Sequence, residues 1–363
     1  MGAARDDRLS GLKRSELAIL GALAAVTVLA GVTRYTHSVS RVVAFVFATL
    51  ALAGMAWIVA LATEQVGERL GPAATGLMQS TVGNLPEFFV VIFALNAGER
   101  VVAETAILGS ILVNALLVLG LVIVAGARRE SDGTMRFNPR LPNDTATLLL
   151  VSSFIIVLIG LTHASGDAAS HHSKTISIVG SVAILVVYVT WLRQYLTSPT
   201  TAGAPTSSGS PRVALATSVV LLVVAGTGSA FVSDWFVNAL QPTIHTLHIS
   251  QAFAGLVIVA IAGNAVENVA GIVLAHKGQA DLAISVVKNS VAQIAAFLYP
   301  LLVLVSLLTP TTLTFSLAPV YIGALFGTSV IVWQITGDGE ATVFEGMALV
   351  ATFVILATVA AFE

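Results

Sequence analysis

Two glutamates stand within long apolar stretches of this 363-residue chain: Glu87 in the string GNLPE and Glu267 in the string GNAVE. A carboxylate inside hydrocarbon is costly, so it is normally paired or functional. Two carboxylates that converge can bind a hard cation such as Ca²⁺, which takes about six to eight oxygen ligands. They can also take up protons, because two close acidic groups do not easily both stay charged. The pair therefore predicts a shared site at which a cation and protons compete.

Each glutamate belongs to a longer segment that occurs twice. Residues 83–110 align without gaps on residues 263–290, at an offset of 180, and the Gly, Asn and Glu of the motif are identical. In both copies the G-N-x-x-E helix is followed by a turn with Gly and by a helix that carries a Ser near its middle. The alternative is that both glutamates are buried hydrogen-bonding groups with a structural role. Their equivalence in the repeat favours the functional interpretation.

The backbone beside each glutamate is expected to be irregular. Pro86 has no N–H, so the carbonyl of Val82 loses its helical partner, and Gly83 weakens the same turn. Gly263 repeats that weakness in the second copy. Carbonyl oxygens freed in this way suit a dehydrated cation, and irregular backbone is tolerated inside a membrane where it lines a cavity. We therefore place both glycines beside the predicted cation and proton site.

The elements that must position these residues are membrane helices. Hydrophobic residues make up 56% of the chain and charged residues 10%, and the mean hydropathy is +0.92. A water-soluble domain carries about 25% charged residues, so the composition excludes one. The absence of cysteine excludes disulfides and thiolate metal sites, and 17 basic against 19 acidic residues leave no basic surplus for nucleic acid.

Eleven apolar runs are long enough to cross about 30 Å of hydrocarbon. No convincing small-residue cleavage site follows the first run, so we expect it to be a helix and not a cleaved signal peptide. The predicted fold is an all-α polytopic membrane protein with about 11 transmembrane helices. The runs cover residues 17–33, 42–63, 72–97, 101–126, 145–162, 174–192, 213–232, 250–275, 281–308, 314–336 and 341–362.

The orientation of the helices follows from the Lys and Arg residues of the short loops. Twelve of them fall on one predicted side and four on the other, which with Lys288 inside a helix accounts for all 17. This bias predicts a cytoplasmic N-terminus and an external Glu363. The two glutamate motifs lie on the third and eighth helices, five crossings apart, so they enter the membrane from opposite sides. The chain is thus predicted to contain an inverted-topology repeat, whose site lies near the bilayer midplane.

The predicted organisation has four parts. Residues 1–40 form a cytoplasmic N-terminus and an extra first helix, and residues 41–193 form the first five-helix repeat. Residues 194–212 are a linker rich in Ser, Pro and Gly, and residues 213–363 form the second five-helix repeat.

Residues 63–99 and 109–120 resemble the first repeat of the calcium/proton antiporters of the calcium:cation exchanger superfamily, and residues 263–304 resemble the second. The resemblance implies that Glu87 and Glu267 bind the cation and exchange it for protons. It also implies that the motif asparagines belong to the same site and that polar groups on the following helices assist. These residues are Asn84, Asn264, Ser110, Asn114, Ser290 and Gln293. The chain has Leu85-Pro86 where the family usually has Ala-Thr. The string LPE is instead similar to the corresponding motif of sodium/calcium exchangers.

Lys288 is a cation inside a predicted helix, next to the polar residues Asn289 and Ser290. One interpretation is that it neutralises a site glutamate and so favours monovalent ions or a different coupling. The other is that its long side chain reaches the cytoplasmic interface. The sequence does not decide between them, so Lys288 and Asn289 are counted as supporting polar residues.

We therefore expect a secondary antiporter, without a resident cofactor and not an enzyme, that exchanges Ca²⁺ or a related cation for protons in a cell membrane. The alternatives are a Na⁺ or K⁺/proton antiporter or a Na⁺/Ca²⁺ exchanger of the same fold. A passive channel is less favoured, because an inverted repeat with two central carboxylates is unlike a symmetric pore filter. No HExxH motif and no serine nucleophile elbow supports an intramembrane hydrolase.

Overall fold

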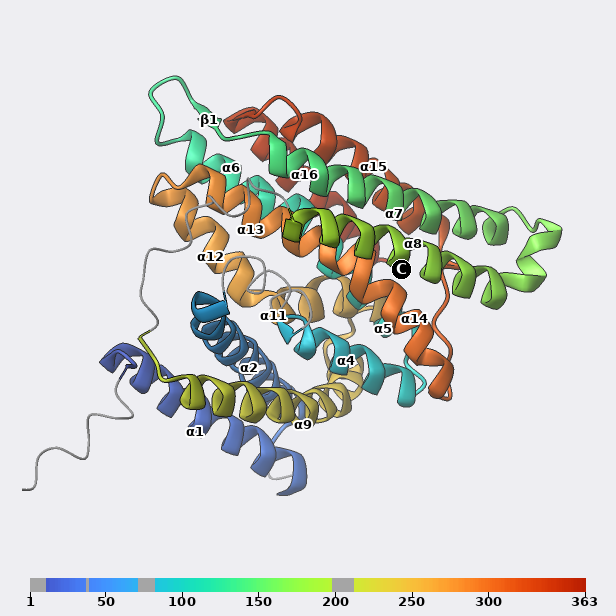
Figure 1. Cartoon of the computed structure of the whole chain (residues 1–363). Coiled ribbons are helices and arrows are strands. Elements are labelled where there is room, and N and C mark those ends of the chain that lie inside the picture. The colour runs from blue at the N-terminus through green and yellow to red at the C-terminus, as the bar shows by residue number, and fades with distance from the viewer. Residues whose placement is uncertain (1–10, 37–38, 71–81, 198–211) are drawn as a thin grey trace, which may run out of the picture. The chain divides into compact units, whose positions relative to one another are not determined.

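The computed structural model describes residues 11–36, 39–70, 82–197 and 212–363 (Figure 1). Within these ranges the chain is nearly all helical, and nine helices are long and apolar enough to cross a membrane. A tenth span consists of two helices, Gln251–Gly263 and Asn268–His276, bent by 59°. The prediction of an all-α polytopic membrane protein is confirmed. The third predicted run, 72–97, begins outside the described residues. Most of the predicted linker 194–212 also lies outside them.

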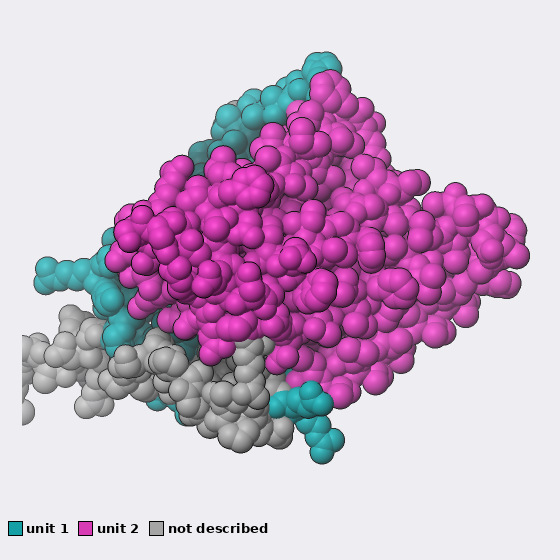
Figure 2. All heavy atoms as spheres, turned by 90° about the horizontal axis from the view of Figure 1, so that it is seen from above, with its two compact units in different colours: residues 1–93, 192–248 teal, residues 94–191, 249–363 magenta. Residues whose placement is uncertain are grey.

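The helices form two compact units, coloured separately in Figure 2. Unit 1 consists of residues 1–93 and 192–248, and unit 2 consists of residues 94–191 and 249–363. Each unit therefore takes helices from both predicted repeats.

In unit 1, α2 and α9 pack along one another and α1 packs against both (Figure 1). At one end of the unit, the side-chain carbonyl of the buried Gln65 accepts the backbone N–H groups of Arg212 and Val213, both at 3.1 Å. Arg212 also pairs with Glu16 at 3.2 Å, so the starts of α1 and α9 lie beside the end of α2. The helices of unit 1 are α1 (Arg14–Thr36), α2 (Arg41–Leu70), the start of α4 (Leu85–Asn96) and α9 (Leu215–Leu247).

Helix α9 is much longer than the predicted run 213–232. The apolar run ends at Ser233 and Asp234, but these residues do not break a helix. Ser233 is buried, and the helix continues through Pro242 until His248 takes a left-handed conformation with φ of 53°. Hydropathy thus located the membrane-crossing part of this helix and placed its end too early.

Unit 2 holds the remaining helices and the short sheet of the described chain. Its helical segments, in chain order, are α5 (Arg100–Leu112), the π-helical η1 (Val113–Val118), α6 (Leu119–Ala127), α7 (Arg140–Ala164), α8 (Ser173–Thr197, whose end belongs to unit 1), α10 (Gln251–Phe253), the π-helical η3 (Ala254–Val259), α11 (Ala260–Gly263), α12 (Ala265–His276), α13 (Ala280–Gln293), the π-helical η4 (Ile294–Leu298), α14 (Tyr299–Val305), α15 (Pro319–Thr336) and α16 (Val343–Ala361). Two single 3-10 turns, η2 (Ala168–His172) and η5 (Ser306–Leu308), lie in the connections.

A two-stranded antiparallel sheet, which the sequence did not predict, closes one end of unit 2. Strand β1 (Thr134–Arg136) pairs with β2 (Glu340–Thr342), and Arg136 lies opposite Glu340. The hydrogen bond from Arg136 lowers the pKa of Asp132, and the backbone N–H of Thr134 lowers it further. The sheet joins the loops after α6 and α15, so these loops lie on the same side of unit 2, as the predicted topology requires.

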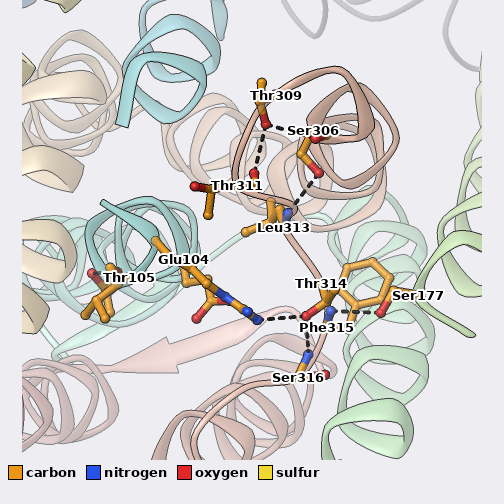
Figure 3. A network of polar contacts seen from close by, with 12 residues as sticks. Glu104, Thr105, Ser177, Ser306, Thr309, Thr311, Leu313, Thr314, Phe315 and Ser316 are labelled. Carbon is orange, nitrogen blue, oxygen red and sulfur yellow. Dashed lines mark hydrogen bonds and ion pairs between the residues drawn. The ribbon is translucent and has the colours of Figure 1, made fainter. Parts of the chain in front are cut away.

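A network of polar contacts occupies the other end of unit 2 (Figure 3). Arg100, at the start of α5, pairs with Glu104 at 2.7 Å and donates to the Thr314 hydroxyl at 3.0 Å. In the same loop the N–H of Phe315 donates to the hydroxyl of Ser177 on α8 at 3.1 Å. These contacts fix the α14–α15 connection beside the start of α5.

Candidate functional site

The sequence repeat is also a repeat of backbone geometry. Helix α4 covers Leu85–Asn96 and α12 covers Ala265–His276, so both ends are offset by 180 residues. The turns that follow use a glycine with positive φ, 81° at Gly98 and 78° at Gly278. The next helices, α5 and α13, start at Arg100 and Ala280, and each passes into a π-helical segment, η1 or η4. Such segments are rare and are frequently found at functional sites.

Within unit 2 the two equivalent rods, α5–η1–α6 and α13–η4–α14, run in opposite directions. Just after the end of the first rod, Arg129 donates to the carbonyl of His276 at 2.7 Å, and the N–H of Asn138 donates to the Asp281 carboxylate at 2.6 Å. The start of the first rod, at Arg100, contacts Thr314 beyond the end of the second rod. The repeated segments are therefore inverted relative to each other.

Four buried polar residues meet near the middle of these rods. The side-chain N–H of Asn114 donates to the side-chain carbonyl of Asn264 at 3.0 Å and to the Ser290 hydroxyl at 3.1 Å. Asn264 in turn donates to the Ser110 hydroxyl at 2.9 Å and to the carbonyl of Ala260 at 2.9 Å. The exposed fractions are 1% for both asparagines, 2% for Ser110 and 7% for Ser290. The structure thus brings together four of the predicted site residues, which we call the Asn–Ser cluster.

Two glycines allow the close approach that forms the Asn–Ser cluster. A Cβ atom on Gly109 would lie 2.4 Å from the backbone oxygen of Leu256. A Cβ atom on Gly255 would lie 2.0 Å from the hydroxyl of Thr105. Helix α5 and the π-helical η3 are therefore in direct backbone contact, which brings Ser110 within reach of Asn264. The sequence analysis did not single out either glycine, because a glycine within an apolar run carries no signal of its neighbour.

Asn264 also marks the break in the bent span. Its φ and ψ of −97° and 18° are not helical, α11 ends at Gly263, and α12 begins at Ala265. Glu267 is consequently the third residue of α12. Its side chain lies outside what the structure describes. The first turn of a helix presents unpaired N–H groups and a positive dipole end, which favour a nearby negative charge.

In unit 1, Glu87 takes the equivalent place as the third residue of α4. Pro86 stands in the first turn, where its missing N–H costs nothing, so it starts the helix instead of kinking it. The carbonyl of Pro86 accepts a hydrogen bond from the hydroxyl of Ser233 on α9 at 3.4 Å. Asn84 and Glu87 are both 6% exposed, so this half of the motif is buried.

Lys288 does not end at an exposed interface. It is 3% exposed, and its ammonium group donates at 2.5 Å to the hydroxyl of Thr336, which is fully buried at the end of α15. The exposed ammonium group that snorkelling to the interface requires is absent. Sequence reasoning missed Thr336, because a threonine at the end of an apolar run has no distinguishing pattern.

The other two supporting residues lie on the same helix. The side-chain oxygen of Asn289 is buried and has no hydrogen-bond partner among the described residues. Gln293 is the last residue of α13, directly before η4. Neither is joined to the Asn–Ser cluster by a hydrogen bond in the described part of the chain.

The arrangement supplies oxygen ligands of two kinds. Asn264 and the two serines of the cluster offer neutral carbonyl and hydroxyl oxygens, and the carbonyl oxygen of Asn264 keeps a second lone pair beyond the one that Asn114 occupies. In the same unit the sequence places Glu267 three residues after Asn264, and its carboxyl group can carry charge and bind protons. Carboxylate and neutral oxygen ligands together are the set that hard cations prefer in proteins.

An all-helical membrane protein with inverted repeats and broken helices that carry buried polar residues belongs to the class of secondary transporters. The chain is a member of the sodium/calcium exchanger protein family, whose sequence model matches residues 40–193 and 217–362. This membership confirms the resemblance seen in the sequence.

Three relatives illustrate the similarity. A protein of Schizosaccharomyces pombe named vacuolar calcium ion transporter is 32% identical over 86% of this chain and 77% of its own length. A protein of Synechocystis named Ca(2+)/H(+) antiporter is 30% identical over 86% of this chain and 89% of its own length. The solved structure described as native YfkE superposes with a TM-score of 0.79 over 95% of this chain and all of that chain, at 26% identity.

Proposed function

We propose that this protein is a secondary antiporter that exchanges Ca²⁺, or a related cation, for protons across a membrane by alternating access. The observation that carries the proposal is the repeated placement of Glu87 and Glu267 in the first turns of two equivalent helices, each three residues after an asparagine. The names of the similar proteins from S. pombe and Synechocystis support calcium as the cation and, for the second, protons as the counter-ion.

In the proposed mechanism the two glutamates bind either the cation or protons. When both are ionised, their charge and the neutral oxygens of Asn84, Asn264 and the nearby serines replace the hydration shell of the cation. Protonation removes that charge and releases the cation. Each glutamate stands in the first turn of its helix, where unpaired backbone N–H groups and the positive dipole end lie.

The remaining assignments rest on the same proposal. The protein transports ions and catalyses no covalent reaction, and it uses no resident cofactor. We place it in a cell membrane with its N-terminus in the cytoplasm, on the basis of the loop charges. A Na⁺ or K⁺/proton antiporter and a Na⁺/Ca²⁺ exchanger are the alternative functions, since the string LPE departs from the usual calcium/proton motif.

Transport in sealed vesicles tests this function. The full chain is reconstituted into proteoliposomes with an imposed pH gradient, and Ca²⁺, Mg²⁺, Mn²⁺, Na⁺ and K⁺ are added in turn. We expect Ca²⁺ to dissipate the gradient most strongly. Dissipation only by Na⁺ or K⁺ would support the monovalent alternative. Ca²⁺ flux down its own gradient without proton movement would instead support a channel and overturn the proposal.

A further inference from the structure

A hollow of about 70 Å³ lies in unit 1. It is formed by the end of α1, the start of α2 and the second half of α9, which lie together in Figure 1. A cavity of about 10–15 Å³ on this scale already holds one water molecule, so the hollow has room for a small polyatomic group. Its polar lining consists of Thr33, Arg34, Arg41, Trp235 and Asn238.

The hollow is rich in hydrogen-bond donors and positive charge. Neither Arg34 nor Arg41 forms an ion pair with a carboxylate in the described part of the chain. The Nε atom of Arg34 and the Nε1 atom of Trp235 are both buried without an acceptor among the described residues. Asp234, the acidic residue next to Trp235, instead accepts a hydrogen bond from the Asn238 side chain at 3.0 Å. Buried donors normally have partners, so these two atoms lack an acceptor among the described residues.

The surroundings of the hollow have the character of a membrane interface. Tyr35 and Trp235 contact edge to face, with ring centroids 6.3 Å apart, and the guanidinium of Arg34 lies 5.7 Å from the Tyr35 ring centre. Tyr and Trp are enriched at headgroup level in membrane proteins. Earlier on α1, Val28 and Val32 are 64% and 47% exposed, so this helix carries an apolar outer surface. A ligand with a charged head and an acyl chain matches both features.

We propose that this hollow binds a phosphate group, and that the group is the headgroup phosphate of an anionic lipid. The planar guanidinium groups of Arg34 and Arg41 supply paired N–H donors that match phosphate oxygens. The indole N–H of Trp235 supplies a further donor. Because the hollow joins α1, α2 and α9, a bound lipid stabilises the packing of α1 against the other two helices.

Lipid binding to the full chain in detergent tests the proposal by native mass spectrometry. The probes are phosphatidylglycerol, phosphatidylcholine and inorganic phosphate. We expect one phosphatidylglycerol to bind more tightly than phosphatidylcholine, and Arg34→Gln or Arg41→Gln to weaken it about tenfold or more, as loss of a charged hydrogen bond does. Lys174→Gln removes one exposed positive charge from α8 and is the matched control, with unchanged binding expected.

Each outcome decides the proposal. Trp235→Phe keeps the ring and removes only the N–H donor, so its weaker binding supports the site even if an arginine variant does not fold. Competition by inorganic phosphate at equal strength would assign the hollow to free phosphate, whereas its failure to compete assigns it to the lipid. Equal phosphatidylglycerol binding by the wild type, both arginine variants and Trp235→Phe would overturn the proposal.

Discussion

The side-chain amide of Asn114 donates a 3.0 Å hydrogen bond to the side-chain carbonyl of Asn264, although 150 residues separate them. Asn264 belongs to one of the two repeated motifs, and Asn114 lies on the helix that follows the other. The bond therefore ties the two halves of the sequence together inside unit 2. It also fixes the orientation of Asn264 at the break before the helix that carries Glu267.

Removal of Asn114 should destabilise unit 2. The Asn114→Ala variant leaves the carbonyl of Asn264 and the hydroxyl of Ser290 without their common donor, and such a loss costs about 1–3 kcal/mol. Thermal unfolding in detergent measures the change. Ser152→Ala is the control, because the buried hydroxyl of Ser152 has no hydrogen-bond partner among the described residues. Equal unfolding temperatures for the two variants would show that the Asn–Ser cluster contributes nothing to stability.

Neutralisation of either motif glutamate should abolish exchange. Glu87→Gln and Glu267→Gln preserve the shape of the side chain but remove the charge and the titratable proton. We expect each to reduce proton-driven cation uptake in proteoliposomes at least about a hundredfold, and the double variant to be hardly worse, as for strongly coupled groups. Glu340→Gln, on the exposed strand β2, removes the same charge elsewhere and should stay active. Near-normal exchange in both single variants would leave the glutamates a structural role.

Acid should weaken cation binding. If protons and the cation compete for the same two carboxylates, the apparent cation affinity falls as the pH is lowered through the pKa values of the pair. The affinity is high above that range, where both carboxylates are ionised, and is lost below it. Initial rates of uptake measured against cation concentration at several pH values check this. An affinity independent of pH would mean that protons and the cation bind at different places.

Substitution of Lys288 should change ion preference. Its buried ammonium group contributes a positive charge two residues before Ser290, and its partner in the described chain is the neutral Thr336. Lys288→Ala removes that charge, so we expect several-fold tighter binding of divalent cations relative to monovalent ones. Thr336→Val, which removes only the hydrogen-bond partner, is the control for local packing. If selectivity and affinity are the same as in the wild type, the lysine has no electrostatic effect on transport.

The loops joined by β1 and β2 should be cytoplasmic. The chain contains no cysteine, so single cysteines can be labelled without background. Ser131→Cys lies in the exposed loop before β1, and Ser165→Cys lies in the exposed connection after α7. An impermeant maleimide added to intact cells should label Ser165→Cys at once and Ser131→Cys only after permeabilisation. The reverse pattern would invert the predicted topology, and labelling of both in intact cells would contradict it.

The sequence by itself predicted the membrane helices because hydropathy is a local property of the chain. It also predicted the repeat, because the two copies share residues at a fixed offset of 180. In the structure, α4 and α12 keep this offset at both ends, and Gly98 and Gly278 share a positive φ. The end of α9 could not be predicted in this way. A helix there is ended by a change of backbone conformation at His248, and not by the polar residues that end the apolar run.

Only the tertiary structure decided how the polar residues of the motifs are used. The sequence places Ser110 and Asn114 on one helix and Asn264 and Ser290 on two others. Their hydrogen bonds depend on the antiparallel rods and on the close approach of α5 and η3 at Gly109 and Gly255. In the same way, the burial of Lys288 against Thr336 depends on the packing of α15, which no local pattern encodes. The sequence therefore determined which residues are chemically able to act and in which helices they stand. The contacts that orient them arise from packing between segments far apart in the chain. These contacts form only when the segments are folded together, so the sequence of one segment alone does not predict them.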